Sequence, residues 1–111
     1  MAIYSNLSVD QGTTFTAYVD VTDNAGDAFN LIGYTVAGQI RKNYNSLTSI
    51  DFTATLFNAI GGTISLELSD TQTNAMKAGR YVYDVEVTSP GGEITRVVEG
   101  QVEVFPGVTR G

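Results

Sequence analysis

The chain has 111 residues, of which 42% are hydrophobic and 16% are charged. This length predicts one domain with one core, and the composition lacks the low hydrophobicity of a disordered chain. The formal net charge of -6 would repel phosphate backbones and anionic lipid surfaces, and no apolar run approaches the roughly 18 residues of a membrane helix. We therefore expect a soluble domain that binds neither nucleic acid nor membranes.

Cysteine and histidine are both absent from the sequence. This excludes disulfides, thiolate chemistry, zinc sites built on either residue, and the commonest general base of enzymes. Residues 1–12 contain neither a basic segment nor a long apolar one, so we predict no secretory signal and synthesis in a host cytoplasm. We expect no cofactor, no bound metal and no enzyme activity.

Alternation of apolar and polar residues predicts a strand over residues 14–22 and another over residues 35–41. Between them, the polar segment 23–27 has the composition of a turn, and a short extended segment follows at residues 29–31. The inward-facing residues are expected to be Phe15, Ala17, Val19 and Val21 in the first strand and Val36, Gly38 and Ile40 in the second.

The next two predicted strands, residues 50–57 and 63–68, form a hairpin around the turn at residues 58–62. Residues 69–79 break the alternation and predict a helix of about two turns. Ser69 and Gln72 have the spacing of a capping box, and Gly79 stands where a left-handed glycine would end the helix. The inward-facing residues are Ile50, Phe52, Ala54 and Leu56 in one strand and Ile64, Leu66 and Leu68 in the other.

The last two predicted strands, residues 80–88 and 93–104, are joined by the turn at residues 89–92. If Thr88 faced Glu93 across this turn, Arg96 would point inward. We therefore predict either a bulge near Arg96 and Val97 or an exposed end of the sheet. The chain as a whole predicts an all-β fold, an immunoglobulin-like antiparallel β-sandwich of about seven strands with one short helix before the sixth strand. We expect the sandwich over residues 1–105 and an extended C-terminal tail over residues 106–111.

The segment Gly79, Arg80, Tyr81, Val82, Tyr83 has the form of a tyrosine corner. In many immunoglobulin-like domains a tyrosine at the start of the sixth strand turns its hydroxyl back onto upstream backbone, and a buried residue follows two positions later. Tyr81 fits the corner and Tyr83 the buried position. We interpret Gly79, Tyr81 and Tyr83 as structural residues, because the pattern places no base near either hydroxyl.

Two groups of acidic residues are candidate sites. Asp84 and Glu86 face outward on one strand, where they could act as an acid and base pair or bind a cation, but solvated groups near Arg80 or Arg96 are favoured. The turn that contains Asp20, Asp23, Asn24 and Asp27 is rich in oxygen ligands but lacks the spacing of a calcium loop. We predict a surface turn there.

No other segment carries catalytic chemistry. The glycine-rich segments 59–63 and 90–93 lack the Lys-Ser/Thr of a phosphate loop and are predicted to be hairpin turns. The serines lie in loops without a nucleophile elbow. At the C-terminus, Val108, Thr109 and Arg110 follow a Pro-Gly pair, and this tail is either a frayed end or a segment that docks on a neighbouring subunit by strand addition or through Arg110.

Three segments carry a resemblance to a known class of proteins. They are QGTTFTAYVDVTDNAGDAFNLIGYTVAGQIRK, GGTISLELSDTQTNAMKAGRYVYDVEVTSPGGEITRVVEGQVEV and the closing VTR. Together they resemble short proteins of tailed bacteriophages that are mostly virion structural proteins, and the layout is similar to the N-terminal immunoglobulin-like domain of lactococcal phage upper baseplate proteins. The resemblance covers about residues 11–110.

The resemblance implies a non-enzymatic virion structural protein, an adaptor or accessory module of the tail or baseplate attached by protein-protein contacts. Its implied partners are other virion proteins, in a homo-oligomer or a symmetric array on the particle. The baseplate proteins continue into modules that carry a receptor-binding partner, whereas this sequence stops at Gly111, so we expect an adaptor without direct host recognition. Tyr18, Tyr44 and Phe57 are exposed aromatic candidates for partner contacts.

Two alternatives remain open. The first is a capsid decoration, or cement, protein. The second is a carbohydrate-binding module that uses Tyr44 and its polar neighbours Asn43, Asn45 and Ser46 in the loop between strands.

Overall fold

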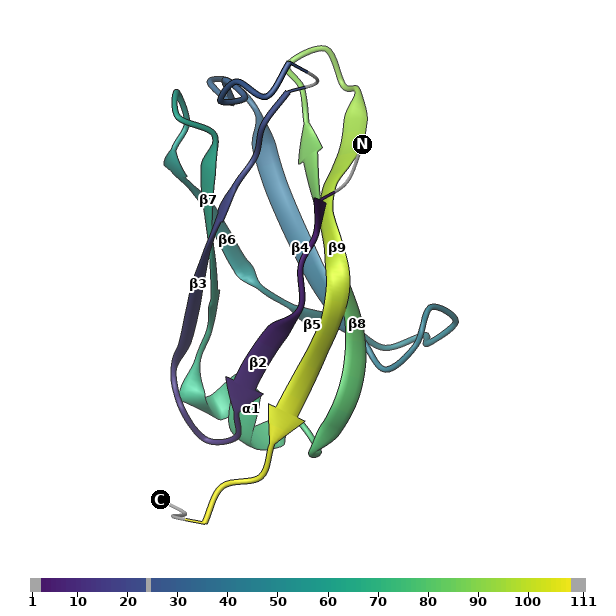
Figure 1. Ribbon diagram of the computed structural model, residues 1–111. Coiled ribbons are helices and arrows are strands. Elements are labelled where there is room, and N and C mark those ends of the chain that lie inside the picture. Colours follow the sequence, from purple (N-terminus) through teal and green to yellow (C-terminus); the bar gives the residue numbers. More distant parts are fainter. Residues whose placement is uncertain (1–2, 24, 109–111) are drawn as a thin grey trace.

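The computed structural model describes residues 3–23 and 25–108 of the chain. Within them, two β-sheets pack face to face and one short helix lies at one end of the sandwich (Figure 1). The elements are β1 (Ile3–Tyr4), β2 (Leu7–Asp10), β3 (Phe15–Asp20), β4 (Thr35–Arg41), β5 (Ile50–Asp51), β6 (Thr53–Asn58), β7 (Thr63–Leu68), α1 (Asp70–Ala75), β8 (Gly79–Thr88) and β9 (Ile94–Phe105).

The larger sheet, here called sheet A, has the strand order β1-β9-β8-β4-β5, with β2 also paired to β9. The smaller sheet, sheet B, has the order β3-β7-β6. The predicted all-β sandwich is confirmed, with nine strands in the described residues. The strands β1 and β2 were not predicted, and the extended segment predicted at residues 29–31 forms no strand. β1 and β2 run parallel to β9, whereas the other pairs are antiparallel.

The core lies between the two sheets, where the predicted alternation places the apolar side chains. In β7, Ile64, Leu66 and Leu68 are buried while Glu67 is exposed. The other buried hydrophobic residues are Val9, Val19, Val21, Leu31, Ile40, Phe52, Met76, Tyr81, Tyr83, Val85, Val87, Val97, Val98, Val102 and Val104. Removal of this apolar surface from water is the main force that holds the two sheets together.

The predicted single strand over residues 50–57 is instead divided between the two sheets. β5 pairs with β4 in sheet A, and β6 pairs with β7 in sheet B. The chain changes sheet at Phe52, whose N–H donates to the carbonyl of Gly38 (3.0 Å) and whose ring packs edge-on against Tyr83. A buried aromatic side chain at the crossing point stabilises this change of sheet, because its ring fills the space between the layers.

The β8–β9 hairpin contains the predicted bulge. Val85 faces Val98 and Glu86 faces Arg96, so Val97 is the extra residue. The register assumed for the turn was wrong by one residue, because Thr88 pairs with Ile94 and not with Glu93. Arg96 points to the outer face of sheet A because it pairs with the outward-facing Glu86, and the bulge at Val97 returns Val98 to the inner face opposite Val85.

The helix has the predicted N-terminus and a different C-terminus. Ser69 Oγ accepts from the N–H of Gln72 (3.1 Å), and Gln72 Oε1 accepts from the N–H of Ser69 (2.9 Å), which confirms the capping box. The predicted role of Gly79 was wrong, because the helix ends at Ala75 and Met76 adopts an extended cap conformation. Gly79 instead begins β8 with a φ of 139° and pairs with Val104.

Candidate functional site

The Tyr81 side chain is buried at the start of β8. Its hydroxyl donates a hydrogen bond to the carbonyl of Lys77, four residues upstream (2.8 Å). Lys42 Nζ lies 4.7 Å from the centre of the Tyr81 ring and donates to the carbonyl of Arg80 (3.1 Å). The hydroxyl is therefore engaged with backbone, in the geometry of a corner.

Tyr83, two residues further along β8, reaches the N-terminal part of the chain. Its hydroxyl donates to the carbonyl of Ser5 (2.6 Å), in the segment between β1 and β2. Burial raises the pKa of the Tyr83 phenol above its ordinary value of 10.0. The neutral, hydrogen-bonding phenol is thus the form that the fold favours, which suits a structural role.

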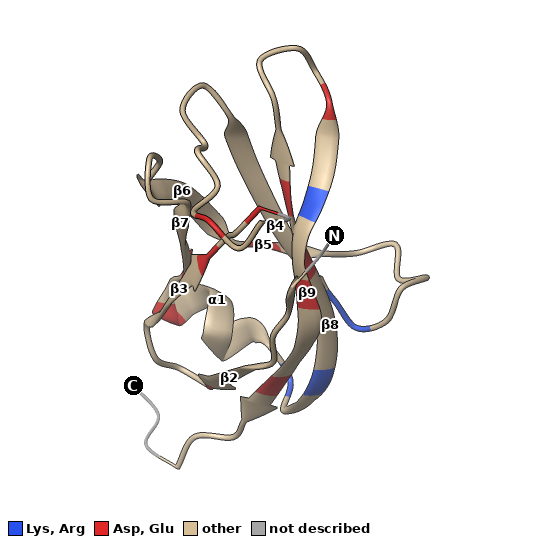
Figure 2. Ribbon diagram, turned by 45° about the horizontal axis from the view of Figure 1, so that its top comes forward, with Lys and Arg blue, Asp and Glu red and all other residues tan. Residues whose placement is uncertain are grey.

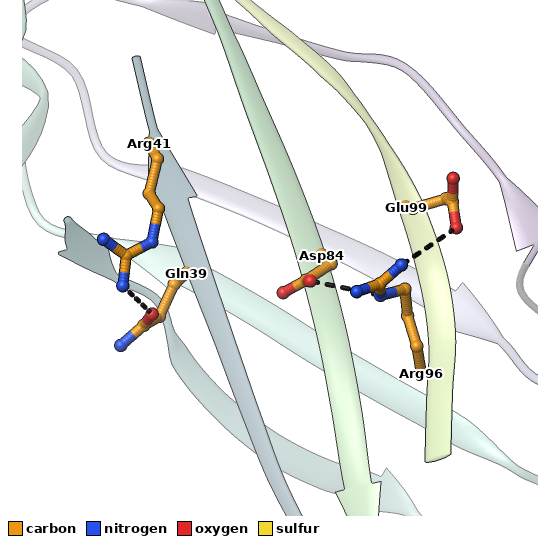
Figure 3. A network of polar contacts seen from close by, with 5 residues as sticks. All are labelled: Gln39, Arg41, Asp84, Arg96 and Glu99. Carbon is orange, nitrogen blue, oxygen red and sulfur yellow. Dashed lines mark hydrogen bonds and ion pairs between the residues drawn. The ribbon is translucent and has the colours of Figure 1, made fainter. Parts of the chain in front are cut away.

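The outer face of sheet A carries a polar network across three adjacent strands (Figure 3). Arg96 on β9 lies between two carboxylates: its Nε is 3.2 Å from Asp84 Oδ2 and its Nη1 is 3.8 Å from Glu99 Oε2. The predicted association of Asp84 with Arg96 is therefore present in the structure.

A second arginine, Arg41 at the end of β4, holds the loop that follows it. Arg41 Nη1 donates to the carbonyl of Ser46 (2.7 Å), and Nη2 donates to Gln39 Oε1 (3.0 Å). Within the loop, Asn43 Oδ1 accepts from the N–H of Asn45 (3.0 Å) and Asn43 N–H donates to Ser46 Oγ (3.1 Å). These bonds fix the loop between β4 and β5, in which Tyr44 lies. The loop projects from the side of the sandwich in Figure 1.

These groups surround a shallow hollow of about 190 Å³ on the outer face of sheet A. Val82 contributes an apolar part of the lining, and Tyr44, 77% exposed, lines it from the loop. The other residues that line it are Gln39, Arg41, Tyr83, Asp84, Arg96 and Glu99. We take this hollow as the candidate binding site of the described part of the chain.

The sequence predicted only part of this site. Tyr44 and Asp84 were candidates and Arg96 was an expected neighbour of Asp84, but no pattern brought Tyr44 together with the other two. Glu99 was missed altogether. Polar residues at the outward positions of three strands could have indicated the site. The order of those strands in the sheet, however, depends on contacts between segments that are far apart in the sequence.

In the acidic turn, the carboxylate of Asp23 stabilises the backbone. Asp23 Oδ1 accepts from the N–H groups of Ala25 (2.9 Å) and Asp27 (3.0 Å). Asp20 Oδ1 accepts from the hydroxyl of Thr63 (2.8 Å). The carboxylate of Asp23 thus closes its own turn, as aspartate side chains commonly do. Asn24, the other predicted member, lies outside the described residues.

The remaining predicted partner-binding residues lie at the C-terminal end. β9 ends at Phe105, and Val108 is 98% exposed. Thr109 and Arg110 lie outside the described residues, so their expected docking role stays a prediction. Gln11 side-chain Oε1 accepts from the N–H of Gly107 (3.4 Å), which holds the beginning of the tail near the end of β2.

Exposed aromatic side chains also occur on the outer face of sheet B. The rings of Tyr18 on β3 and Phe57 on β6 lie 4.9 Å apart in an edge-to-face arrangement, and they are 60% and 66% exposed. Ser65, which faces Tyr18 in register on the intervening strand, is buried. The pair is a compact apolar surface on a face that otherwise carries polar side chains.

Positively charged side chains are distributed unequally between the two sheets (Figure 2). All lysine and arginine residues in the described ranges belong to strands of sheet A or to the segments that adjoin them, and they are Arg41, Lys42, Lys77, Arg80 and Arg96. Over the same ranges, α1 is the only helix, and no helix is long and apolar enough to cross a membrane.

No protein-family model and no curated protein matches the chain. Among solved structures, the N-terminal domain of phage TP901-1 ORF48 is similar with a TM-score of 0.62 and 14% sequence identity, over 90% of this chain and 84% of that chain. A mutant of the SrpA adhesin from Streptococcus sanguinis is similar with a TM-score of 0.51 and 10% identity, over 90% of this chain and 54% of that chain. These comparisons show a fold that the chain shares with a domain of a phage protein.

Proposed function

We propose that the chain is a non-enzymatic structural protein of a bacteriophage particle, an adaptor or accessory module of the tail or baseplate held by protein-protein contacts. The observation that carries this proposal is the fold shared with the N-terminal domain of phage TP901-1 ORF48, which extends over 90% of this chain and 84% of that domain. A match that covers most of both chains relates two whole domains. Fold alone does not determine function, so the site must agree with the proposal.

The chemistry of the described residues agrees with a structural role. The two buried tyrosine hydroxyls, Tyr81 and Tyr83, each donate to a backbone carbonyl. Asp84, the carboxylate that sequence reasoning weighed as an acid or base, is paired with Arg96. These groups stabilise strands and loops, and the sequence contains no histidine that could serve them as a base.

The proposal includes the way in which the chain is attached. Residues 1–105 form the sandwich and residues 106–111 the tail, and the tail residues Val108, Thr109 and Arg110 dock on a neighbouring virion protein. The exposed Tyr18–Phe57 pair on sheet B supplies further apolar contact surface. The chain then occurs as a homo-oligomer or symmetric array on the virion, since particles are built by repetition of identical contacts.

Electron microscopy of particles made without the chain tests the proposal. Filled heads with incomplete or missing tails are the expected result for an adaptor of the tail or baseplate. Complete tails on heads that lose DNA on mild heating would instead support the capsid decoration alternative. Particles that are normal in assembly and stability would contradict a structural role of either kind.

A further inference from the structure

We propose that the hollow on the outer face of sheet A binds a single sugar ring of a neutral glycan. This inference goes beyond the structural role above, and the binding site stands on the geometry of the chain alone. The volume of about 190 Å³ lies below the range of about 300–1,000 Å³ typical of sites for drug-sized ligands. The hollow therefore suits one small ring.

The charges around the hollow balance. Arg41 and Arg96 contribute two positive charges, and Asp84 and Glu99 contribute two negative charges. A strongly anionic ligand such as a phosphate would meet two carboxylates, and a cationic ligand would meet two guanidinium groups. An uncharged ligand with many hydroxyl groups meets no such repulsion and can use both kinds of group.

The lining presents donors and acceptors at fixed positions. A guanidinium carries five N–H groups, and within the described ranges Arg41 uses Nη1 for Ser46 and Nη2 for Gln39. Each carboxylate offers two oxygens, and the ion pair with Arg96 is made by Oδ2 of Asp84 and Oε2 of Glu99. Hydrogen bonds to charged groups are the stronger kind, and vicinal hydroxyl groups can donate to a carboxylate and accept from a guanidinium at once.

Tyr44 gives the hollow an apolar side. Its ring is 77% exposed, and its loop is held by the bond from Arg41 to Ser46 and by the bonds around Asn43. The face of a sugar ring that carries C–H groups is apolar and packs against aromatic rings, as amphipathic tyrosine side chains allow. A loop held in place before binding loses little conformational entropy on binding.

A protein partner fits this hollow less well than a sugar. The centre of a protein-protein interface is depleted in charged residues, whereas Asp84, Arg96 and Glu99 stand together here. A protein surface laid over this ion pair network would remove it from water, which is costly without well-placed partners. A hydroxylated ring of limited size leaves the network partly hydrated.

The test is a titration of the full 111-residue chain, labelled with ¹⁵N, with the methyl glycosides of glucose, galactose, N-acetylglucosamine and rhamnose. We expect saturable amide shifts confined to β4, β8, β9 and the Tyr44 loop for at least one sugar, with a dissociation constant on the order of 1 mM. No saturable shift with any of the four sugars at about 50 mM, well above that constant, would overturn the proposal.

Two matched pairs of variants locate the binding. Tyr44→Ala should weaken binding about tenfold, whereas Leu47→Ala, in the same loop and 98% exposed but outside the hollow, should leave it unchanged. Asp84→Asn should also weaken it about tenfold, whereas Glu86→Gln, on the same face of β8, should not. Equal binding by all four variants would overturn the assignment of the site. A second result would also overturn it. If the parent chain bound no sugar and the Tyr44→Ala chain were no longer incorporated into phage particles, the face would serve a protein partner.

Discussion

Tyr83 on β8 donates a hydrogen bond of 2.6 Å to the carbonyl of Ser5, 78 positions earlier in the chain. The bond crosses β9, which lies between β8 and the parallel strands β1 and β2 in sheet A. It therefore ties the N-terminal segment to the middle of the larger sheet, beside the place where Ser5 N–H donates to the carbonyl of Glu99 (2.9 Å).

The change Tyr83→Phe removes this bond and leaves the ring in place. We expect the free energy of unfolding to fall by about 1–2 kcal/mol, because the partly buried carbonyl of Ser5 loses its partner. Urea unfolding followed by fluorescence measures this value, and an unchanged slope with a lower midpoint is expected. A midpoint equal to that of the parent would mean that water replaces the hydroxyl at no cost.

The same residue predicts a dependence of stability on alkaline pH. Burial raises the pKa of Tyr83 above 10.0 in the folded chain, so the unfolded chain releases this proton first. The contribution of Tyr83 is complete below about pH 10 and is lost as the pH rises through the folded pKa. Urea midpoints measured from about pH 8 to about pH 11 should fall more steeply for the parent than for Tyr83→Phe. Parallel curves would contradict this assignment.

The corner residue is tested by Tyr81→Phe. This change removes the bond from the hydroxyl to the Lys77 carbonyl and should lower the free energy of unfolding by about 1 kcal/mol. Sugar binding at the hollow should remain intact, since Tyr81 does not line it. Thermal unfolding measured by circular dichroism compares the two chains. An unchanged melting temperature of Tyr81→Phe would contradict the interpretation of Tyr81 as a corner residue.

Gly100 on β9 makes room for the N-terminal segment. A Cβ atom added there would lie 2.0 Å from the carbonyl oxygen of Ser5, so Gly100→Ala must displace the segment between β1 and β2. We expect a loss of about 1–3 kcal/mol, the usual cost of overpacking. Gly91→Ala is the control, because its Cβ would meet nothing closer than Ser89 Oγ at 3.8 Å. Equal stability of the two variants would contradict the close approach.

Local patterns predicted much of the fold. Alternation identified the buried faces of β3, β4 and β7, and the spacing of Ser69 and Gln72 predicted the capping box. The pattern around Arg96 gave a bulge as one of two alternatives, although from a register that was one residue off. Each of these signals lies within a few residues, where backbone geometry and one layer of packing determine the outcome.

The remaining features depend on contacts between distant segments. The change of sheet at Phe52 follows from packing against Tyr83, which the sequence around Phe52 does not encode. The parallel pairing of β1 and β2 depends on the surface of β9. The hollow needs β4, β8 and β9 side by side, so no single segment contained the pattern that would predict it.

Removal of residues 108–111 tests the proposed docking tail. The truncated chain should unfold within about 0.5 kcal/mol of the parent, because Val108 is almost fully exposed and β9 ends before it. Incorporation into phage particles should fall, as measured by immunoblot of purified virions. A chain with Gly-Ser residues in the same four positions controls for length. Full incorporation of the truncated chain would contradict the docking role.

The measurement that tests the central claim most directly is the number of copies of the chain per purified phage particle, determined by quantitative mass spectrometry. An adaptor of the tail or baseplate follows cyclic symmetry, so the account predicts roughly six to eighteen copies. A count on the order of hundreds would follow icosahedral symmetry and contradict the tail in favour of the capsid surface. Absence of the chain from the particle would contradict the virion role itself.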